Sequence, residues 1–235
     1  MKTYNIIGKG FIAKSFFKIN KIIKKSNYII YAAGISNSKT NSKKALFKEI
    51  RLFKRFTNKN YFKKLVFIST ADINNNLKKK DSYIKNKIKI ENIIKKRFSN
   101  YIILRLPQII GNSKNKNTLI NYFYRNIRKG KYITVYSNIK RNVLDIDDVI
   151  KVLKILLFDK KIKKKTLTIS NKYSFEPIDL VKIIEKKLNK KAKIQLKKGI
   201  KQKWRINNMS STILFNKANV SFDKNYLLNK INKYF

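Results

Sequence analysis

A tyrosine and a lysine stand four residues apart in this chain, at positions 83 and 87. On a helix, residues at this spacing share one face, so the Lys87 ammonium would lie beside the Tyr83 phenol. A neighbouring positive charge favours phenolate and lowers the pKa of a tyrosine, which makes Tyr83 a candidate acid/base near neutral pH. Ser69 and Thr70 close the preceding apolar run. A hydroxyl from either residue could polarise a substrate carbonyl or alcohol.

The spacing of Tyr83 and Lys87 also has a chance explanation. The chain contains 13 Tyr, and Lys and Arg together number 58, so a Tyr followed four residues later by Lys will recur without meaning. The context favours the chemical interpretation, because an apolar strand that ends in Ser-Thr, a loop and a helix follow one another here. We therefore take Tyr83 as the candidate acid/base, with Thr70 and Lys87 beside it.

The amino-acid composition narrows the chemistry further. The 235 residues include neither Cys nor His, which excludes disulfides, thiolate sites, a Cys nucleophile and a Ser-His-Asp triad. Acid–base chemistry then falls to Tyr, Lys, Asp, Glu or the backbone, and we expect no metal site. Hydrophobic residues make up 43% of the chain, enough for a sizeable core. No apolar run approaches the roughly 18 residues that span a bilayer, so we expect no membrane partner and a cytoplasmic location.

A glycine-rich turn near the N-terminus suggests a phosphate site. A short apolar strand runs into Gly8-Lys-Gly10-Phe11-Ile12-Ala13, and a helix follows. The first glycine permits the tight turn, the second lets a pyrophosphate approach the backbone, and Ala13 lets the helix pack close to the sheet. The alternative is an ordinary glycine-rich turn of any α/β protein.

The acidic residue that usually accompanies such a turn is missing. In proteins where such a turn binds a dinucleotide, an Asp or Glu about 20 residues later normally holds the hydroxyls of the dinucleotide's ribose. Before residue 80 only Glu49 and Asp72 are acidic, and neither follows a second strand. The run from Tyr28 to Gly34 looks like a later strand of the fold. The strand, helix and strand that would normally precede it are shortened here. The choice between NAD and NADP therefore stays open.

Short continuous apolar runs alternate with longer helical patterns along the chain, which is typical of a parallel α/β sheet buried on both faces. We expect strands at 4–7, 28–32, 65–69, 101–104, 133–136 and 166–169. We expect helices at about 11–24, 40–57, 81–98, 117–129, 146–158, 176–189 and 223–233. A more polar stretch after Pro107 and Gly111 indicates that a second lobe begins there.

In this order, the motifs resemble those of extended short-chain dehydrogenases/reductases, and most of all the NAD-dependent epimerase/dehydratase group of cell-surface polysaccharide pathways. The motifs are Gly8-x-Gly-x-x-Ala13, Ala32-Ala-Gly34, Ser69-Thr70, Tyr83-x-x-x-Lys87, Leu104-Arg-Leu-Pro-Gln-Ile-Ile-Gly111 and Arg141-Asn-Val-Leu-Asp-Ile-Asp-Asp148. The resemblance implies a Rossmann-like doubly wound parallel sheet with a small C-terminal substrate lobe. An NAD(P)-binding domain would span 1–110, with a shortened second-strand region, and the substrate lobe 111–235, interleaved with the sheet.

The resemblance also implies roles for single residues. Tyr83 would be the acid/base, Lys87 would lower its pKa and hold the nicotinamide ribose, and Thr70, with Ser69 as the alternative, would bond the reacting oxygen. The residues implied to line a site for NAD or NADP are Gly8, Gly10, Phe11, Ile12, Ala13, Ala32, Ala33, Gly34, Ser69 and Pro107. Gln108 and Arg141 would contact a nucleotide-sugar substrate, with Arg141 clamping its diphosphate. A homodimer is a further implied partner.

Three acidic residues gather at 145, 147 and 148. We interpret Asp145, Asp147 and Asp148 as structural: they would cap the next helix and pair with nearby lysines. A cluster that binds a metal is the alternative.

The net charge of +46, from 58 Lys and Arg against 12 Asp and Glu, has two interpretations. A nucleic-acid partner would suit such a basic chain. Lys supplies nearly all the charge, however, whereas nucleic-acid surfaces usually carry more Arg. We favour a drift in composition, of the kind an AT-rich coding sequence produces. The alternatives to an enzyme are a nucleic-acid-binding protein and a non-catalytic cofactor-binding protein on the same fold.

Overall fold

The computed structural model describes residues 5–35, 42–60, 63–74, 81–116, 118–199 and 208–235. Its centre is a five-stranded parallel sheet in the order β1-β2-β3-β4-β8. The strands are β1 (Ile6–Ile7), β2 (Tyr28–Tyr31), β3 (Lys64–Thr70), β4 (Tyr101–Leu106) and β8 (Lys165–Thr168). All four residues of β2 are buried, as expected for a continuous apolar strand covered on both faces. The expected parallel α/β sheet is confirmed.

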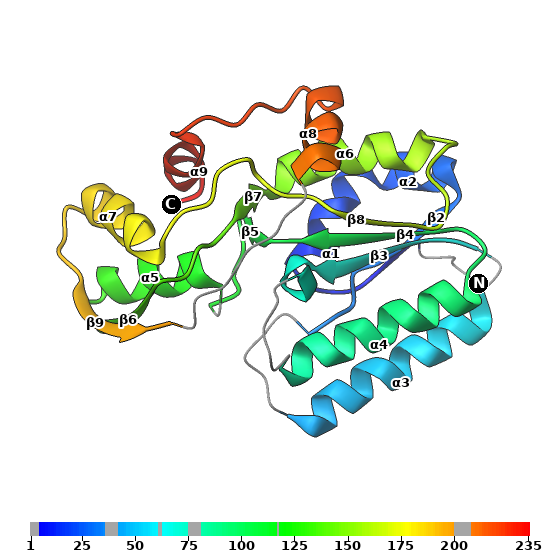
Figure 1. Cartoon of the computed structure of the whole chain (residues 1–235), viewed down its shortest axis with the longest axis horizontal. Helices are drawn as coiled ribbons and strands as arrows, with labels where there is room; N and C mark the ends of the chain where they lie inside the picture. Colours follow the sequence, from blue (N-terminus) through cyan, green and yellow to red (C-terminus); the bar gives the residue numbers. More distant parts are fainter. Residues whose placement is uncertain (1–4, 36–41, 61–62, 75–80, 117, 200–207) are drawn as a thin grey trace.

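Helices cover both faces of this sheet (Figure 1). One layer contains α1 (Phe11–Phe16), α2 (Asn20–Ser26) and α6 (Ile146–Phe158), and the other contains α3 (Lys43–Asn60) and α4 (Ser82–Arg97). Each layer closes its own core. Phe16, Ile23 and Leu153 are buried on the first side, and Phe53 and Ile90 on the second.

Strand β1 lies at the edge of the described sheet. It pairs with β2 alone, with Ile6 opposite Ile30. In the usual dinucleotide-binding order, two further strands continue the sheet beyond the first strand. Here α2 ends at Ser26, and the left-handed backbone of Asn27 (φ 59°) turns the chain directly into Tyr28 of β2. The shortened cofactor half expected from the sequence follows from this direct connection.

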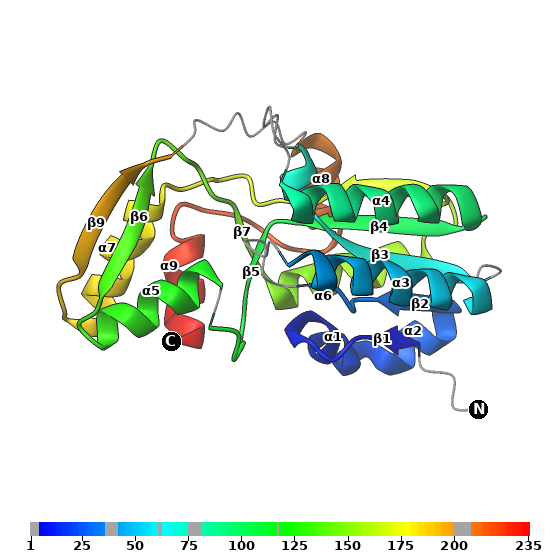
Figure 2. The same cartoon turned by 90° about the horizontal axis from the view of Figure 1, so that it is seen from below.

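A second, smaller assembly lies beside the sheet (Figures 1 and 2). Its elements are α5 (Leu119–Arg128), β6 (Tyr132–Ser137), α7 (Pro177–Leu188), β9 (Lys193–Lys198) and α9 (Tyr226–Tyr234). Strands β6 and β9 pair in parallel, and a separate core forms around Phe123, Ile127 and Leu180. A short parallel pair, β5 (Gln108–Ile110) with β7 (Val143–Asp145), lies between the two parts.

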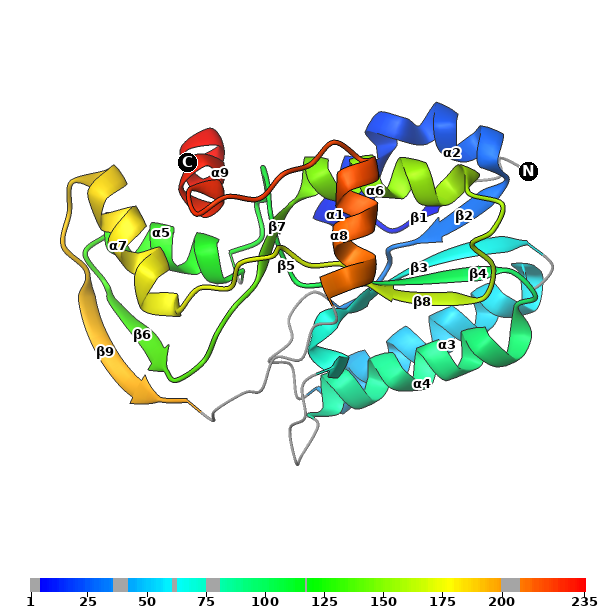
Figure 3. The same ribbon diagram turned by 45° about the horizontal axis from the view of Figure 1, so that its top comes forward.

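Segments after residue 110 return to the sheet. Strand β8 pairs with β4, α6 packs on α1 and α2, and α8 (Asn208–Lys217) contacts α6 and β8 (Figure 3). The expected boundary between 110 and 111 stays a prediction. None of the helices in the described part of the chain combines the length and the apolar character needed to cross a membrane.

The acidic cluster at the start of α6 is structural, as expected. Asp145 caps this helix by accepting a hydrogen bond from the Asp147 backbone N–H at 3.0 Å. Lys230 and Lys233 of α9 form ion pairs with Asp145 at 2.9 and 3.3 Å, and Lys18 pairs with Asp147 at 3.1 Å. No group of three or more metal-ligating side chains is found among the residues that the structure describes. The cluster therefore fastens α9 to the end of β7 and the start of α6.

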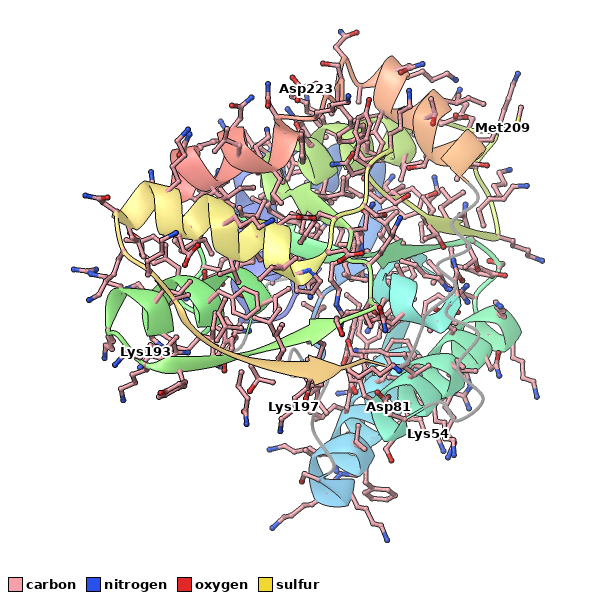
Figure 4. The ribbon with its side chains drawn as sticks, turned by 60° about the vertical axis from the view of Figure 1, so that its left-hand side comes forward. Lys54, Asp81, Lys193, Lys197, Met209 and Asp223 are labelled. Atoms are coloured by element: carbon pink, nitrogen blue, oxygen red, sulfur yellow. The ribbon has the colours of Figure 1, made fainter. Side chains whose placement is uncertain are left out.

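The positive charge is spread over the molecule. In Figure 4, nitrogen-tipped side chains project outward from helices and strands across the whole view, including the labelled Lys54 of α3 and Lys193 and Lys197 of β9. This distribution supports an interpretation in which lysine fills solvated positions generally.

Candidate active site

The carboxyl ends of the parallel strands meet at one edge of the sheet, where ligands of open α/β folds bind. Gly8 follows β1, Ala32 follows β2, Thr70 ends β3 and Pro107 follows β4. The sequence motifs therefore come together although they lie far apart along the chain.

The turn after β1 is packed as a dinucleotide turn requires. Gly8 has φ +143°, a conformation that side chains rarely adopt, and a Cβ placed there would lie 2.7 Å from the Ala32 carbonyl oxygen and 2.9 Å from the Ala13 Cβ. Ala13 is fully buried. Only glycine fits at position 8, because α1 passes this close to the strand ends.

Open space lies beside the next glycine. A Cβ at Gly10 would have nothing within 4 Å, and no side chain caps the N-terminus of α1. The Phe11 ring reaches across to Gly111, where a Cβ would lie 2.5 Å from the ring tip. An uncapped helix start behind an open glycine fits the pyrophosphate of a dinucleotide.

Thr70 ends β3 in a tight turn with Asp72. Its Oγ1 accepts a hydrogen bond from the Asp72 backbone N–H at 3.2 Å and donates to Asp72 Oδ2 at 3.4 Å. Burial raises the pKa of Asp72, with Arg141 and the Thr70 hydrogen bond acting in the opposite direction. A carboxyl group with increased proton affinity therefore stands beside the Thr70 hydroxyl.

Tyr83 lies in the first turn of α4 and is 9% exposed. The helix starts at Asp81, whose side chain accepts a hydrogen bond from the Ile84 N–H at 2.8 Å. Burial is the main cause that raises the pKa of Tyr83, and the negative charges of Asp72, Glu49 and Asp81 raise it further. A hydrogen bond with Thr70 acts in the opposite direction. Thr70 and Tyr83 therefore form one site.

Lys87 is buried on the same helix, with its Nζ 5.4 Å from the centre of the Tyr83 ring. Its ammonium forms an ion pair with Glu49 Oε1 at 2.7 Å. The expectation was that Lys87 lowers the pKa of Tyr83. In this structure the pKa of Tyr83 is raised instead, mainly by burial, and the Lys87 ammonium is paired with the Glu49 carboxylate. A Cβ at Gly34 would lie 2.5 Å from the Lys87 Nζ, so the glycine after β2 makes room for the pair.

Ser69 belongs to a different set of contacts. Its hydroxyl donates to Glu91 Oε1 at 2.7 Å, and Glu91 forms an ion pair with Arg105 of β4 at 2.6 Å. Successive residues of a strand point to opposite faces, so Ser69 and Thr70 diverge. The structure brings Thr70 to Tyr83 and gives Ser69 a structural partner.

The two expected substrate contacts have unsatisfied polar atoms. Gln108 Oε1 and Arg141 Nε are buried, with no hydrogen-bond partner among the described residues. Both lie at the β5–β7 pair, where the Gln108 N–H donates to the Asn142 carbonyl at 3.2 Å. Burial lowers the pKa of Arg141, and the charge of Asp72 raises it. A buried polar group without a partner is costly, and a polar ligand would satisfy these atoms.

Sequence reasoning missed two residues of this site, Glu49 and Asp72. Glu49 is the only acidic residue of α3, and it lies on the buried side of the helix among exposed basic residues. That isolated acid was the available signal. Asp72 follows Thr70 by two residues, a spacing typical of a side-chain turn.

The sheet order, the glycine turn and the Thr70–Tyr83–Lys87 group define an extended short-chain dehydrogenase/reductase. The family model described as "NAD dependent epimerase/dehydratase family" matches residues 14–169, and the chain belongs to this family. The match begins directly after Ala13, the last residue of the glycine turn. A search of curated protein sequences gives no match.

Solved structures show the same fold. UDP-glucuronic acid 4-epimerase from Bacillus cereus, in complex with UDP-glucuronic acid and NAD, superposes with a TM-score of 0.70 at 18% identity, over 91% of this chain and 76% of that one. dTDP-glucose 4,6-dehydratase from Bacillus anthracis, in complex with NAD, gives 0.65 at 18% over 96% and 78%. UDP-N-acetylglucosamine 4-epimerase from Bacillus cereus gives 0.68 at 16% over 97% and 92%.

Proposed function

We propose that this protein is an NAD- or NADP-dependent epimerase, dehydratase or keto-reductase that acts on a nucleotide-activated sugar. The observation that carries the proposal is that Thr70, Tyr83 and Lys87 come together at the carboxyl ends of the strands, on the same side of the sheet as the turn at Gly8. The family membership and the nucleotide-sugar enzymes with the same fold support the substrate class.

The residues present suit the pyrophosphate of a dinucleotide better than its adenosine ribose. Gly8, Gly10 and Ala13 would hold the pyrophosphate at the start of α1, with Phe11 and Ile12 in the first turn, while Ala32, Ala33, Gly34 and Pro107 would line its path along the strand ends. In the described chain no strand follows α1 before β2, so the usual acidic partner of the adenosine ribose is missing. We therefore leave NAD and NADP as equal candidates.

A dinucleotide held by Gly8, Gly10 and Ala13 would supply hydride transfer to or from a sugar carbon. As an acid, the neutral Tyr83 hydroxyl would donate its proton to the sugar oxygen as a carbonyl is reduced to the hydroxyl. To take the proton of a sugar hydroxyl as the carbonyl forms, Tyr83 would first release its own proton to solvent, because burial raises its pKa. The Thr70 hydroxyl, which donates to Asp72 Oδ2 in the ligand-free protein, would turn to donate a hydrogen bond to the same sugar oxygen and fix its position. Lys87 would provide positive charge near the Tyr83 ring, to the extent that its ion pair with Glu49 loosens. The buried setting of Tyr83 keeps water away from this proton transfer.

Arg141 and Gln108 would bind the substrate from the β5–β7 pair. The Arg141 guanidinium is suited to a diphosphate, because its fork of N–H donors matches phosphate oxygens. Its unpartnered Nε and the unpartnered Gln108 Oε1 are the atoms that the substrate would satisfy.

The test is turnover of a panel of UDP- and dTDP-sugars by the purified chain with NAD or NADP, followed by chromatography and mass spectrometry. Epimerisation gives a product of the same mass and a new retention time, dehydration gives loss of water, and keto-reduction consumes the reduced cofactor. Unchanged substrate throughout the panel, with a folded protein, would contradict the proposal.

Replacing Arg141 with Ala is expected to raise KM for the nucleotide sugar by about 10-fold or more, because a charge-assisted hydrogen bond contributes about 1.5–3 kcal/mol. The effect on kcat is expected to be smaller, since the diphosphate lies away from the reacting carbon. Steady-state kinetics measures both. Arg128→Ala, at an exposed position of α5, is the matched control and should leave KM unchanged. Equal KM values for the two variants would remove Arg141 from the substrate site.

We also propose a homodimer as the working assembly. Phe47 and Leu52 of α3 are large apolar side chains with exposed fractions of 68% and 45%. Light scattering after size exclusion tests the proposal, and a monomeric mass across the working concentration range would contradict it.

A further inference from the structure

Glu49 is a buried carboxylate that the mechanism above does not use. It lies on α3 and is 6% exposed. Its Oε1 accepts hydrogen bonds from Lys87 Nζ at 2.7 Å and from the Ile35 backbone N–H at 3.2 Å, and its Oε2 accepts one from Asn86 Nδ2 at 2.6 Å. Three donors from two segments therefore hold this carboxylate in one place.

The ion pair of Glu49 and Lys87 is closed off from solvent. Both side chains are at most 4% exposed. Removing two charges from water costs free energy that their mutual attraction repays only with good geometry, and an apolar pair of similar volume often serves stability as well. Stability alone therefore does not account for charges at these two positions. Both residues lie close to Tyr83, which suggests an electrostatic role there.

Charged side chains from several elements lie near Tyr83. Glu49 approaches from α3, Asp72 from the turn after β3, Asp81 from the loop before α4, and Lys87 from α4 itself. Arg141 interacts electrostatically with Asp72. The Lys87 Nζ lies 5.4 Å from the centre of the Tyr83 ring and pairs with Glu49 at 2.7 Å.

We propose that Glu49 is a positioning residue: it holds the Lys87 ammonium in a buried ion pair and offsets the positive charge of that ammonium at Tyr83. The lysine acts on the tyrosine only to the extent that this pair loosens. The inference deepens the proposed function, on which its catalytic meaning rests, but the proton state of Tyr83 exists without turnover.

The test is an NMR titration of the ligand-free full chain with tyrosine labelled at Cζ, in which the Tyr83 signal is identified by its loss in Tyr83→Phe. In Glu49→Gln the Lys87 charge is no longer compensated, and the midpoint of the Tyr83 titration is expected to fall by about one pH unit or more. In the wild type the Tyr83 signal should remain that of a neutral phenol at pH values at which ordinary tyrosines are already ionised.

Glu91→Gln is the matched control. Glu91 is also a buried carboxylate in an ion pair, with Arg105, but it is not among the charges that act on Tyr83. We expect Glu91→Gln to lower the melting temperature and leave the Tyr83 midpoint unchanged. If Glu49→Gln does the same, its role is structural and the proposal is overturned. Should a variant be unfolded in dilute buffer, all titrations are repeated in trimethylamine N-oxide, which favours the compact state.

The outcome is independent of the proposed function. A lowered midpoint in a chain that converts no nucleotide sugar would keep the inference and remove the activity. Turnover together with an unchanged midpoint would do the reverse.

Discussion

Tyr83→Phe is expected to lower kcat on the nucleotide sugar by a factor of about 10²–10⁴, the usual contribution of a positioned acid/base. The change removes only the hydroxyl that would exchange a proton with the sugar. The ring stays in place, since it is packed with Ile73 and Ile84. Dinucleotide affinity is expected to change little, because the turn at Gly8 and Gly10 is untouched.

The control for this variant is Tyr28→Phe. The Tyr28 hydroxyl also forms one hydrogen bond, with Asn100 Oδ1 at 3.2 Å, but it lies at the start of β2, away from the carboxyl ends. We expect its kcat to equal that of the wild type. Turnover retained by Tyr83→Phe would remove Tyr83 as the acid/base and leave a cofactor-binding fold without the proposed chemistry.

Asp145→Ala is expected to lower the free energy of unfolding by about 3–5 kcal/mol, the usual effect of removing one partner from a buried ion pair. Asp145 is fully buried and accepts a hydrogen bond from the Tyr234 hydroxyl at 2.6 Å. Its loss would leave Lys230 paired only with Asp148, at 3.2 Å, and α6 without its cap. Urea unfolding measures the change.

Asp159→Ala is the comparison for that result. Asp159 also accepts a local backbone hydrogen bond, from the Lys161 N–H at 2.9 Å, but on the surface. We expect a loss below about 1 kcal/mol for this variant. A similarly small loss for Asp145→Ala would mean that α9 is held by its apolar contacts and that the ion pairs contribute little.

The same cluster predicts how stability depends on pH. The hydrogen bond from Lys233 lowers the pKa of Asp147 to about 2, and although burial opposes it, hydrogen bonds from Tyr234 and Lys230 lower the pKa of Asp145 as well. A carboxylate whose pKa is lowered in the folded protein stabilises the folded state at pH values above its ordinary pKa, which is near 3.8. This stabilisation should therefore disappear as pH falls from about 4 towards 2, and Asp145→Ala should show a weaker acid dependence.

The sequence predicted the elements with strong apolar patterns and missed the weak ones. The expected strands at 28–32 and 101–104 correspond to β2 and β4, and the helix expected at 146–158 is α6. Strand β9 was missed because its residues, Lys-Ile-Gln-Leu-Lys-Lys, look like a solvated lysine run, and five of its six residues are exposed. Strands β5 and β7 have three residues each, too short for a periodic signal.

The candidate site was predictable where a motif fixes the backbone. Gly8 and Ala13 could be placed because their small size is what the turn requires. The partner of Lys87 could not be predicted, since Glu49 lies 38 residues away and reaches the lysine only through the packing of α3 on α4. Sequence spacing shows which residues share a helix face, but it does not show which charges from other elements meet them.

The most direct test of the account is a fluorescence titration of NADH and NADPH into the wild type and Gly10→Val. A Cβ at Gly10 meets nothing in the protein, so this variant should fold normally while its side chain occupies the place of the pyrophosphate. We predict saturable binding of at least one dinucleotide to the wild type and its loss in Gly10→Val. No saturable binding to the wild type, or equal binding to both proteins, would contradict the account.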